Sequence, residues 1–129
     1  MVTHLDPEQI VTAWLGVILA APAFVGWEHC TDVAPGVTPE KLVQVRQIGG
    51  VGEARVAVRP RIDIRVWGSL SDPSADINTK QTARTLCEAL RSALNARVVL
   101  IPTLFPDVAD SRRLHAMFTL ELLTRGVNL

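Results

Sequence analysis

The sequence predicts an α+β domain, with a mixed, mostly antiparallel sheet and two helices packed on one face of it. Two segments, one near the N-terminus and one in the middle of the chain, repeat apolar residues at the helical period. Two further segments alternate apolar and polar residues with a period of two, as strands do. The order is helix, strands, helix, strands, and placing both helices on one sheet face is the simplest way to cover every apolar side.

The size and charge of the chain restrict its class. The 129 residues suit a single domain spanning residues 1–129. The 13 basic and 13 acidic residues give a formal net charge of zero. The surface as a whole therefore lacks the cationic excess that holds proteins on nucleic acid or anionic lipid. Hydrophobic residues make up 48% of the chain, which is high for a small domain, so we expect some apolar surface to contact another subunit.

The first helix is predicted to begin with Asp6 as N-cap and Pro7 at the first helical position. Its expected buried side carries Ile10, Val11, Trp14 and Ile18, and Leu15, Val17 and Leu19 widen the apolar surface. A helix that is apolar nearly all round is expected to be covered on two sides, by its own sheet and by a second surface.

The same region resembles a targeting segment in two respects. Residues 9–27 contain no charge, and Ala21-Pro22-Ala23 has the small-x-small pattern of a secretory cleavage site. However, no Lys or Arg precedes the apolar run, as a signal peptide requires. Pro22 also interrupts it before the roughly 20 residues that a membrane span needs. We therefore interpret the segment as a buried helix and expect no membrane association.

The first group of strands follows a loop that contains Pro35, Gly36 and Pro39. Residues 42–48 are predicted to form a strand that the glycines of 49–52 end, and residues 54–67 form the next one. In this second strand Val58, Ile62, Ile64 and Val66 should face the core, and Arg59, Arg61, Asp63 and Arg65 the solvent. Because Pro60 lacks an N–H donor, we expect this strand at an edge of the sheet or bulged, and edges are where subunits attach.

The second half of the chain repeats the order of helix and strands. Ser71-Asp72-Pro73 precedes a helix whose apolar side carries Ile77, Ala83, Leu86, Leu90, Ala93 and Leu94. Residues 97–101 are predicted to form a strand that Pro102 closes, and residues 102–113 a polar loop that holds Phe105 and Pro106. The last strand covers residues 114–124. Its expected core side carries Leu114, Ala116, Phe118, Leu120 and Leu122, opposite His115, Thr119 and Glu121.

The chain offers no recognisable catalytic constellation. Its three histidines are scattered, and Cys30 and Cys87 have no paired spacing, so we predict no metal site and expect reduced thiols in a cytosol. His29 precedes Cys30, but adjacent strand residues point to opposite faces, which favours a structural Cys30.

Gly50-x-Gly52 lacks the third glycine and the helix of a phosphate loop. Asp63 and Glu121 could form a carboxylate pair, but no nucleophile accompanies them. We predict no enzymatic activity and no cofactor.

The charges are distributed unevenly along the chain. Residues 1–45 hold five acidic residues and one basic residue, a net charge of −4, whereas residues 46–65 have a net charge of +3. Three interpretations of the arginines remain open: a solvated strand face, a surface that meets acidic residues of a neighbouring chain, or a contact with nucleic-acid phosphates. The arginines are Arg46, Arg55, Arg59, Arg61 and Arg65.

Several strings resemble the tail terminator, or tail completion, proteins of long-tailed bacteriophages. They are Leu42-Val-Gln-Val-Arg-Gln-Ile-Gly-Gly50, Arg59-Pro-Arg-Ile-Asp-Ile-Arg-Val-Trp-Gly68, the helical residues 83–94 and Met117-Phe-Thr-Leu-Glu-Leu-Leu-Thr-Arg-Gly126. They occur in the expected order and cover most of the chain from about residue 6. Residues 24–35 depart from the family, which has a cleaner strand there. Eleven arginines against two lysines suit a phage of a high-GC host.

The resemblance implies a structural virion protein that acts at the head-tail junction and is assembled in the host cytoplasm. Such a protein forms a homo-oligomeric ring, hexameric in the family, that caps the tail tube, ends its growth and offers the head its docking surface. Its partners would be the tail tube protein and a head-tail connector protein, and genomic DNA would pass through the ring without sequence-specific binding. The five arginines, with Gly50, Gly52 and Phe105 from flexible segments at 49–57 and 102–113, are the candidate interface.

Two other functions remain open from the sequence. The nearer one is another head-tail connector protein, an adaptor or a stopper, which works on the head side of the same junction. The more distant one is a small α/β ligand-binding or regulatory domain, whose sign would be a polar pocket that holds a metabolite.

Overall fold

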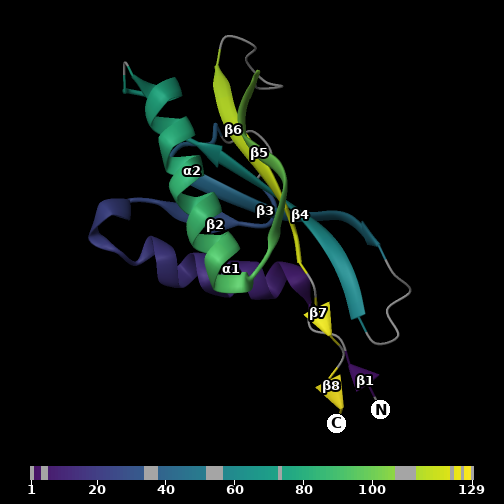
Figure 1. The fold of residues 1–129 in the computed structure, drawn as a ribbon. Coiled ribbons are helices and arrows are strands. Elements are labelled where there is room, and N and C mark those ends of the chain that lie inside the picture. Colours follow the sequence, from purple (N-terminus) through teal and green to yellow (C-terminus); the bar gives the residue numbers. More distant parts are fainter. Residues whose placement is uncertain are drawn as a thin grey trace.

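The fold was analysed in a computed structural model, which describes residues 2–3, 6–33, 38–51, 57–72, 74–106, 113–122, 124–125 and 127–128. Figure 1 shows two helices against a twisted sheet. The helical elements are α1 (Pro7–Leu19), the short 3₁₀ helix η1 (Pro22–Phe24) and α2 (Ala75–Leu94). The strands are β1 (Val2–Thr3), β2 (Glu28–Cys30), β3 (Leu42–Val51), β4 (Ala57–Trp67), β5 (Arg97–Pro106), β6 (Leu114–Glu121), β7 (Thr124–Arg125) and β8 (Val127–Asn128).

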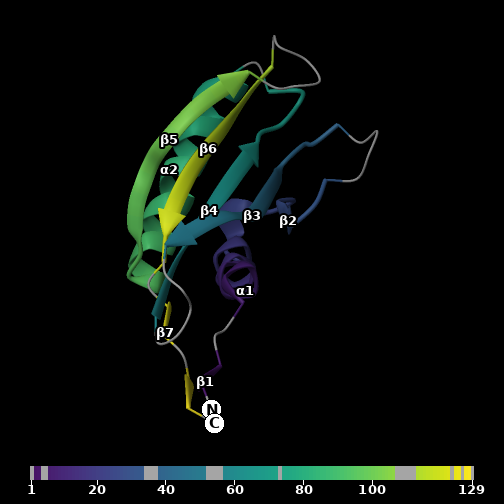
Figure 2. The ribbon, with the colours of Figure 1, turned by 90° about the vertical axis from the view of Figure 1, so that its right-hand side faces the viewer.

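The main sheet has the strand order β2-β3-β4-β6-β5, and β7 pairs with the beginning of β4. β2 lies parallel to β3, whereas the other neighbours in this sheet are antiparallel. The separate pair of β1 and β8 is also antiparallel. Both helices pack on one face of the sheet, where their buried residues join Ile62, Ile64 and Phe118 in a single core (Figure 2). The predicted α+β class and the mixed, mostly antiparallel sheet are therefore confirmed.

Helix α1 begins as predicted but turns a different side to the core. The Asp6 carboxylate accepts a hydrogen bond of 3.0 Å from the Glu8 N–H, and Pro7 occupies the first turn. The buried residues are Val11, Leu15 and Leu19. The prediction that Trp14 lies on the buried side was wrong, because each helical residue advances about 100° and Trp14 falls at the edge of the stripe that these three define.

Helix α2 is held at both ends by groups outside its apolar stripe. Asp72 accepts hydrogen bonds from the Ser74 N–H at 2.8 Å and from the Asn78 amide at 2.6 Å. Asn95 ends the helix in the left-handed conformation, at φ 49°. Ala83, Leu86 and Leu90 are buried as predicted. Ile77 was wrongly placed on this side: it lies about 200° round the helix from the buried Thr79 and is exposed. Ala93, in the last turn, is also exposed.

The position of β4 corrects the prediction that this strand lies at an edge of the sheet. β4 is central, between β3 and β6, rather than at an edge. The Pro60 carbonyl accepts a hydrogen bond of 2.9 Å from the Leu122 N–H, so the side of Pro60 that lacks a donor faces β6. The ladder between β4 and β6 ends at Arg61, one residue away. The sheet therefore tolerates this proline in a central strand because the missing donor falls where one neighbour stops.

The strand bounds bring two further corrections. Gly49 and Gly50 continue β3 instead of ending it, and a register shift between Gln47 and Gly49 leaves Ile48 as an extra residue. β5 continues through Pro102 to Pro106, because an edge strand needs donors on one side only. Part of what was predicted as a polar loop, including Phe105, is therefore strand. The predicted loop residues 34–37 and the strand residues 54–56 lie outside the described residues.

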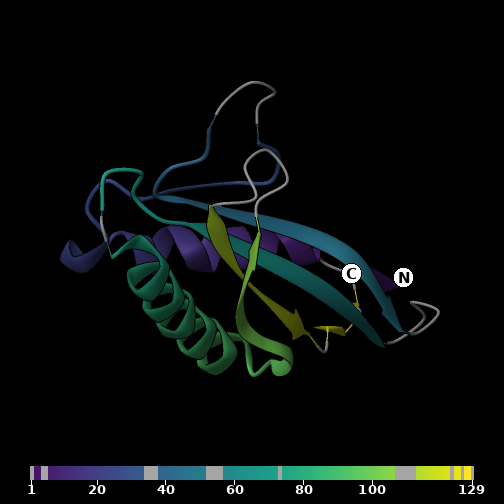
Figure 3. The ribbon, with the colours of Figure 1, turned by 90° about the horizontal axis from the view of Figure 1, so that it is seen from above.

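The last long strand follows its predicted alternation. In β6 the side chains of Ala116, Phe118 and Leu120 are fully buried in the core beneath the helices, and Leu122 just beyond it is also buried. Figure 3 shows from above how α2 crosses the strands while α1 runs at an angle to it. Within the part of the chain that the structure describes, no helix is long and apolar enough to cross a membrane.

Phe118 tests the location of the core. It is a fully buried aromatic residue paired with Ile64 in the central strand. We expect Phe118→Ala to lower the free energy of unfolding by about 3–5 kcal/mol, because it removes buried surface and leaves a cavity. Urea denaturation followed by circular dichroism measures this loss. Met117→Ala, one residue away on the opposite sheet face, is the control and should cost much less; equal losses would contradict this placement of the core.

Candidate functional site

The sheet face opposite the helices carries the candidate interface. Residues 61, 63 and 65 of β4 alternate with the buried Ile62, Ile64 and Val66, so they point away from both helices. No described helix or strand covers this face, which we call the open face. The predicted orientation of Arg61, Asp63 and Arg65 is therefore confirmed.

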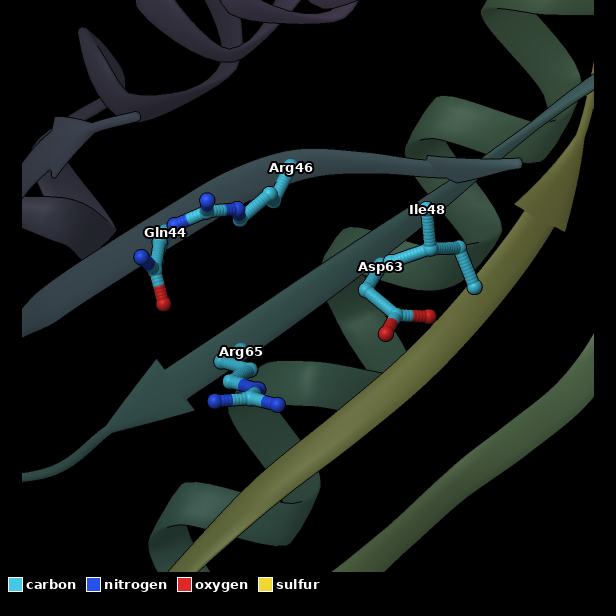
Figure 4. Close-up of a pocket in the computed structure, with 5 residues that line it drawn as sticks. All are labelled: Gln44, Arg46, Ile48, Asp63 and Arg65. Atoms are coloured by element: carbon cyan, nitrogen blue, oxygen red, sulfur yellow. The ribbon is translucent and has the colours of Figure 1, made fainter. Parts of the chain in front are cut away.

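A hollow of about 260 Å³ lies on the open face between β3 and β4. Figure 4 shows Gln44, Arg46 and Ile48 along β3 facing Asp63 and Arg65 of β4. The alternation of β3 places Ile48 on the same face as Gln44 and Arg46. The floor is fixed, because Gln44 is buried and its side-chain amide donates a hydrogen bond of 3.1 Å to the Thr31 carbonyl.

Two of the arginines are paired within the chain. The guanidinium of Arg46 lies 3.0 Å from the Asp32 carboxylate, and both side chains are exposed. The guanidinium of Arg61 lies 3.4 Å from the carboxylate of Glu121, its partner across the β4–β6 ladder. The exposed pair of Arg46 and Asp32 contributes about 0–1 kcal/mol. The Glu121 side chain is only 11% exposed, so water and salt screen its pair with Arg61 less.

The other residues of the predicted interface are in different positions. Arg59 is exposed near the beginning of β4, and Arg65 is exposed at the hollow; neither forms an ion pair with any residue in the described ranges. Gly50 lies within β3, opposite Pro60. Gly52 and Arg55, with the rest of 52–56 and with 107–112, lie outside the described residues. The flexible segments predicted at 49–57 and 102–113 therefore contain strand at Gly49–Val51 and at Pro102–Pro106.

Phe105 lies in a row of rings. Its ring centroid is 6.3 Å from that of His115, which lies 5.4 Å from that of Trp67. The Trp67 side chain is buried, and its indole N–H has no acceptor among the residues that the structure describes. Phe105 is only half-buried and is already in contact within its own chain. Trp67 was missed as a residue of this face, although the alternation of β4 places it with Arg65 and Asp63.

The carboxylates considered for acid-base chemistry are separated by the strand register. Asp63 lies opposite Thr119 and accepts a hydrogen bond of 2.6 Å from its hydroxyl, whereas Glu121 lies opposite Arg61. Each carboxylate thus has its own partner on the neighbouring strand.

The thiols are poorly suited to nucleophilic chemistry. Burial raises the pKa of the Cys30 thiol, and the nearby carboxylates of Asp32 and Glu28 raise it further. Burial also raises the pKa of Cys87, in the buried stripe of α2. A raised pKa keeps a thiol protonated at neutral pH, where only the thiolate attacks. Across the described ranges, no group of three or more His, Cys, Asp and Glu residues could hold a metal ion.

The acidic residues of the first third are mostly used inside the chain. Asp6 caps α1, and Glu8 accepts a hydrogen bond of 2.8 Å from the Gln47 N–H of β3. Glu40 accepts hydrogen bonds from the Leu70 N–H and the Ser69 hydroxyl. An acidic residue of the first third was expected to meet an arginine of a neighbouring chain. Asp32 instead pairs with Arg46 of its own chain.

Comparison of the sequence with models of known protein families, and with curated proteins, finds no match to either.

The hydrogen bond between Asp63 and Thr119 tests whether the open face is structurally fixed. We expect Thr119→Val to lower the free energy of unfolding by about 1–2 kcal/mol, because it removes the donor to a half-buried carboxylate. Thr119→Ser keeps the hydroxyl and should retain most of the stability. Thermal or urea denaturation of both variants measures the difference, and equal stability of the two would show that this hydrogen bond contributes nothing.

Proposed function

We propose that the chain is a tail terminator protein of a long-tailed bacteriophage. In this role several copies form a ring, hexameric in the family that the chain resembles, at the head-tail junction of the virion. The ring caps the tail tube, ends its polymerisation and offers the connector its docking surface. The protein works through contacts with other proteins and carries out no reaction.

One observation carries this proposal: no described helix or strand packs on two separate surfaces of the molecule. The open face of the sheet is one, and the outer side of α1 with its exposed Trp14 and Val17 is the other. A cyclic ring requires two different surfaces on each subunit, because one meets the other head to tail. The high apolar content of the chain agrees with burial at such contacts.

The lining of the hollows argues against the ligand-binding alternative. Pockets for small molecules usually measure about 300–1,000 Å³ and are lined mainly by apolar side chains. The hollow on the open face measures about 260 Å³, and a second one of about 440 Å³ lies beside the beginning of α1; all but one of the residues that line each hollow are polar or charged. A contact surface for a protein side chain fits them better than a metabolite site.

The neutrality of the chain agrees with a conduit for DNA. With 13 basic and 13 acidic residues, a ring of this chain has no overall cationic excess. A strongly basic lumen would bind the phosphates of the genome and retard its passage. We therefore propose that DNA passes the ring without sequence-specific binding.

Electron microscopy of a lysate from the phage that carries a stop codon early in this gene tests the proposal. We expect DNA-filled heads beside unattached tails of abnormal, extended length, because nothing ends tube growth. Restoring the gene from a plasmid should restore normal particles. Unattached tails of normal length with leaking heads would assign the chain to the connector side instead, and intact infectious particles would refute both assignments.

Arginines on the solvent side of β4 provide a second test. We expect the double variant Arg59→Glu, Arg61→Glu to block assembly of infectious particles, because it reverses the charge of the candidate interface. The fold should persist with a loss of about 1–2 kcal/mol, because Arg61→Glu removes the pair with Glu121 and places a like charge opposite this largely buried carboxylate. Plaque counts by complementation and a thermal melt measure the two effects.

Arg84→Glu is the matched control, because Arg84 is exposed on α2, away from the open face. It should leave the titre unchanged. A normal titre from the β4 double variant would remove these arginines from the interface.

A further inference from the structure

One edge of the main sheet is only partly paired. β3 has ten residues, but β2 pairs with only three of them, from Leu42 to Gln44. Beyond Gln44 no strand in the described ranges pairs with β3 on the side away from β4. Figure 1 shows β3 continuing past β2 with β4 along one side only. β1, which precedes α1 in the chain, pairs with β8 instead. The second half of β3 is therefore a strand edge, which we call the β3 edge.

The backbone at the β3 edge offers hydrogen-bonding groups to a further strand. The Pro60 carbonyl faces β6, so the backbone groups of Asp63, three residues on, face β3. Asp63 lies opposite Arg46, whose backbone groups therefore face β4, and those of Gln47 face outward. The Gln47 N–H donates to the Glu8 carboxylate at 2.8 Å. A side chain thus takes the place of a neighbouring strand at this donor.

A hollow lies beside the β3 edge, where β2 ends. The Thr31 carbonyl, directly after β2, accepts a hydrogen bond of 3.1 Å from the Gln44 side-chain amide. The hollow measures about 440 Å³ and lies between Thr31 and the first turns of α1. Glu8 and Thr31 both line it and also bind Gln47 and Gln44, so it follows β3 between these two residues. A strand that continues the line of β2 would enter it.

The charge of this hollow determines which side chain fits. Asp6 and Glu8 line it, and both accept hydrogen bonds, but from the neutral N–H groups of Glu8 and Gln47. Neither carboxylate forms an ion pair with a described residue. The N-terminus of α1 offsets only about half an elementary charge. Lys41 does not line the hollow, because its side chain lies beside Gly26, beyond the other end of α1. A Lys or Arg of an incoming strand would supply the missing charge.

An added strand would turn its side chains alternately to two surfaces. One set faces α1 and the acidic hollow. The other set faces the open face, where the Ile48 side chain is 55% exposed and the Arg46 guanidinium is paired with Asp32. Because the basic group on that side already has a carboxylate, an apolar side chain beside Ile48 is the better match. The two surfaces together favour a segment that alternates basic and apolar residues.

We propose that an extended segment of another protein adds to β3 as a strand in the line of β2, with a Lys or Arg side chain at Glu8. The Gln47 N–H then donates to a carbonyl of the segment, and the Glu8 carboxylate accepts from the incoming cation. Backbone hydrogen bonds hold the segment, and the alternation of its side chains selects it. This interaction goes beyond the proposed function and does not depend on it.

Glu8 also explains why the β3 edge does not pair with any strand that meets it. Sheets protect free edges with charged side chains and bulges, and both occur here. The Glu8 carboxylate occupies the Gln47 donor, and the register shift after Gln47 interrupts the edge. A strand without a base would leave the displaced carboxylate unpaired, whereas a basic strand replaces its hydrogen bond with an ion pair. The shift also limits the pairing to a short segment around Gln47.

The opposite edge of the sheet is a poorer site for an added strand. Two register shifts interrupt the pairing of β5 with β6, one after Val98 and one after Leu100. Pro102 and Pro106 each lack a backbone donor. We therefore expect a strand to add at β3 and not at β5, and this difference can be observed residue by residue.

Nuclear magnetic resonance of the isotope-labelled chain, titrated with a synthetic peptide, tests the proposal. The probe is acetyl-Thr-Val-Lys-Val-Lys-Val-Thr-amide. We expect a Kd below about 1 mM, with the largest amide shifts at Gln47, at Ile48 and in the first turn of α1. The same peptide with Glu in place of both Lys residues should bind about tenfold more weakly, because it brings like charges to Glu8.

N-methylated peptides test the backbone contact. In a strand only alternate N–H groups face the neighbour. Methylation of the two Lys nitrogens and methylation of the Val nitrogens should therefore differ: one should weaken binding about tenfold, and the other should leave it nearly unchanged. Equal affinities of the two methylated peptides would mean that side chains alone make the contact, and would overturn strand addition without any change to the protein.

Glu8→Gln tests the selection of a base. The substitution keeps an acceptor for the Gln47 N–H and removes the charge, so the Lys and Glu peptides should bind within about threefold of each other. Glu40→Gln is the matched control, because Glu40 also accepts a hydrogen bond from a backbone N–H, that of Leu70, and does not line the hollow. It should keep the tenfold preference, and a thermal melt checks that both variants fold.

Three further results would overturn the proposal. Binding that does not saturate near 1 mM would remove the site, and shifts confined to Val99 and Ile101 would place the peptide at β5. Gln47 shifts that grow with protein concentration alone would show that a second copy occupies the edge. None of these results bears on the tail terminator assignment, which the phage without the gene tests separately.

Discussion

The alternation of β4 is the constraint on which the rest of the structure depends. Ile62, Ile64 and Val66 point to the helices, and the residues between them point to the open face. A shift of the β4 pairing by one residue would exchange these two sets and expose the core. β3 and β6 both pair along this strand, so they inherit the same division into a buried and an open face. The candidate interface exists because this one strand separates its arginines from its isoleucines.

Much of the fold could be predicted from the sequence because it is encoded locally. The cap at Asp6, the period of α2 and the alternation of β6 each depend on residues within one element. The errors concern relations between elements. Whether Pro60 is tolerated in a central strand depends on which neighbour its missing donor faces, and that depends on strand order. The bulges of β3 and β5 likewise depend on the partner strand, which no period in the sequence reveals.

The candidate site was predictable to the same extent. Alternation alone places Arg61, Asp63 and Arg65 on one face, but their partners come from elsewhere: Glu121 and Thr119 from β6, and Asp32, the partner of Arg46, from the segment after β2. The sequence predicted that its own sheet would cover only part of α1, but not which residues would be exposed, because apolar composition does not show which side of an apolar helix the sheet covers. Its small exposed residues and the absence of charge over 9–27 were the available signals.

The burial of the tryptophans has an optical consequence. The chain contains three tryptophans and no tyrosine, so its intrinsic fluorescence comes almost wholly from indole rings. Trp67 is 4% exposed beneath its ring neighbours, Trp27 is half-buried, and Trp14 has much of its ring in water. An event that covers α1 changes the surroundings of one emitter and leaves the most enclosed one as an internal reference. The molecule thus carries its own reporter of what happens at that helix, and no dye is needed to follow it.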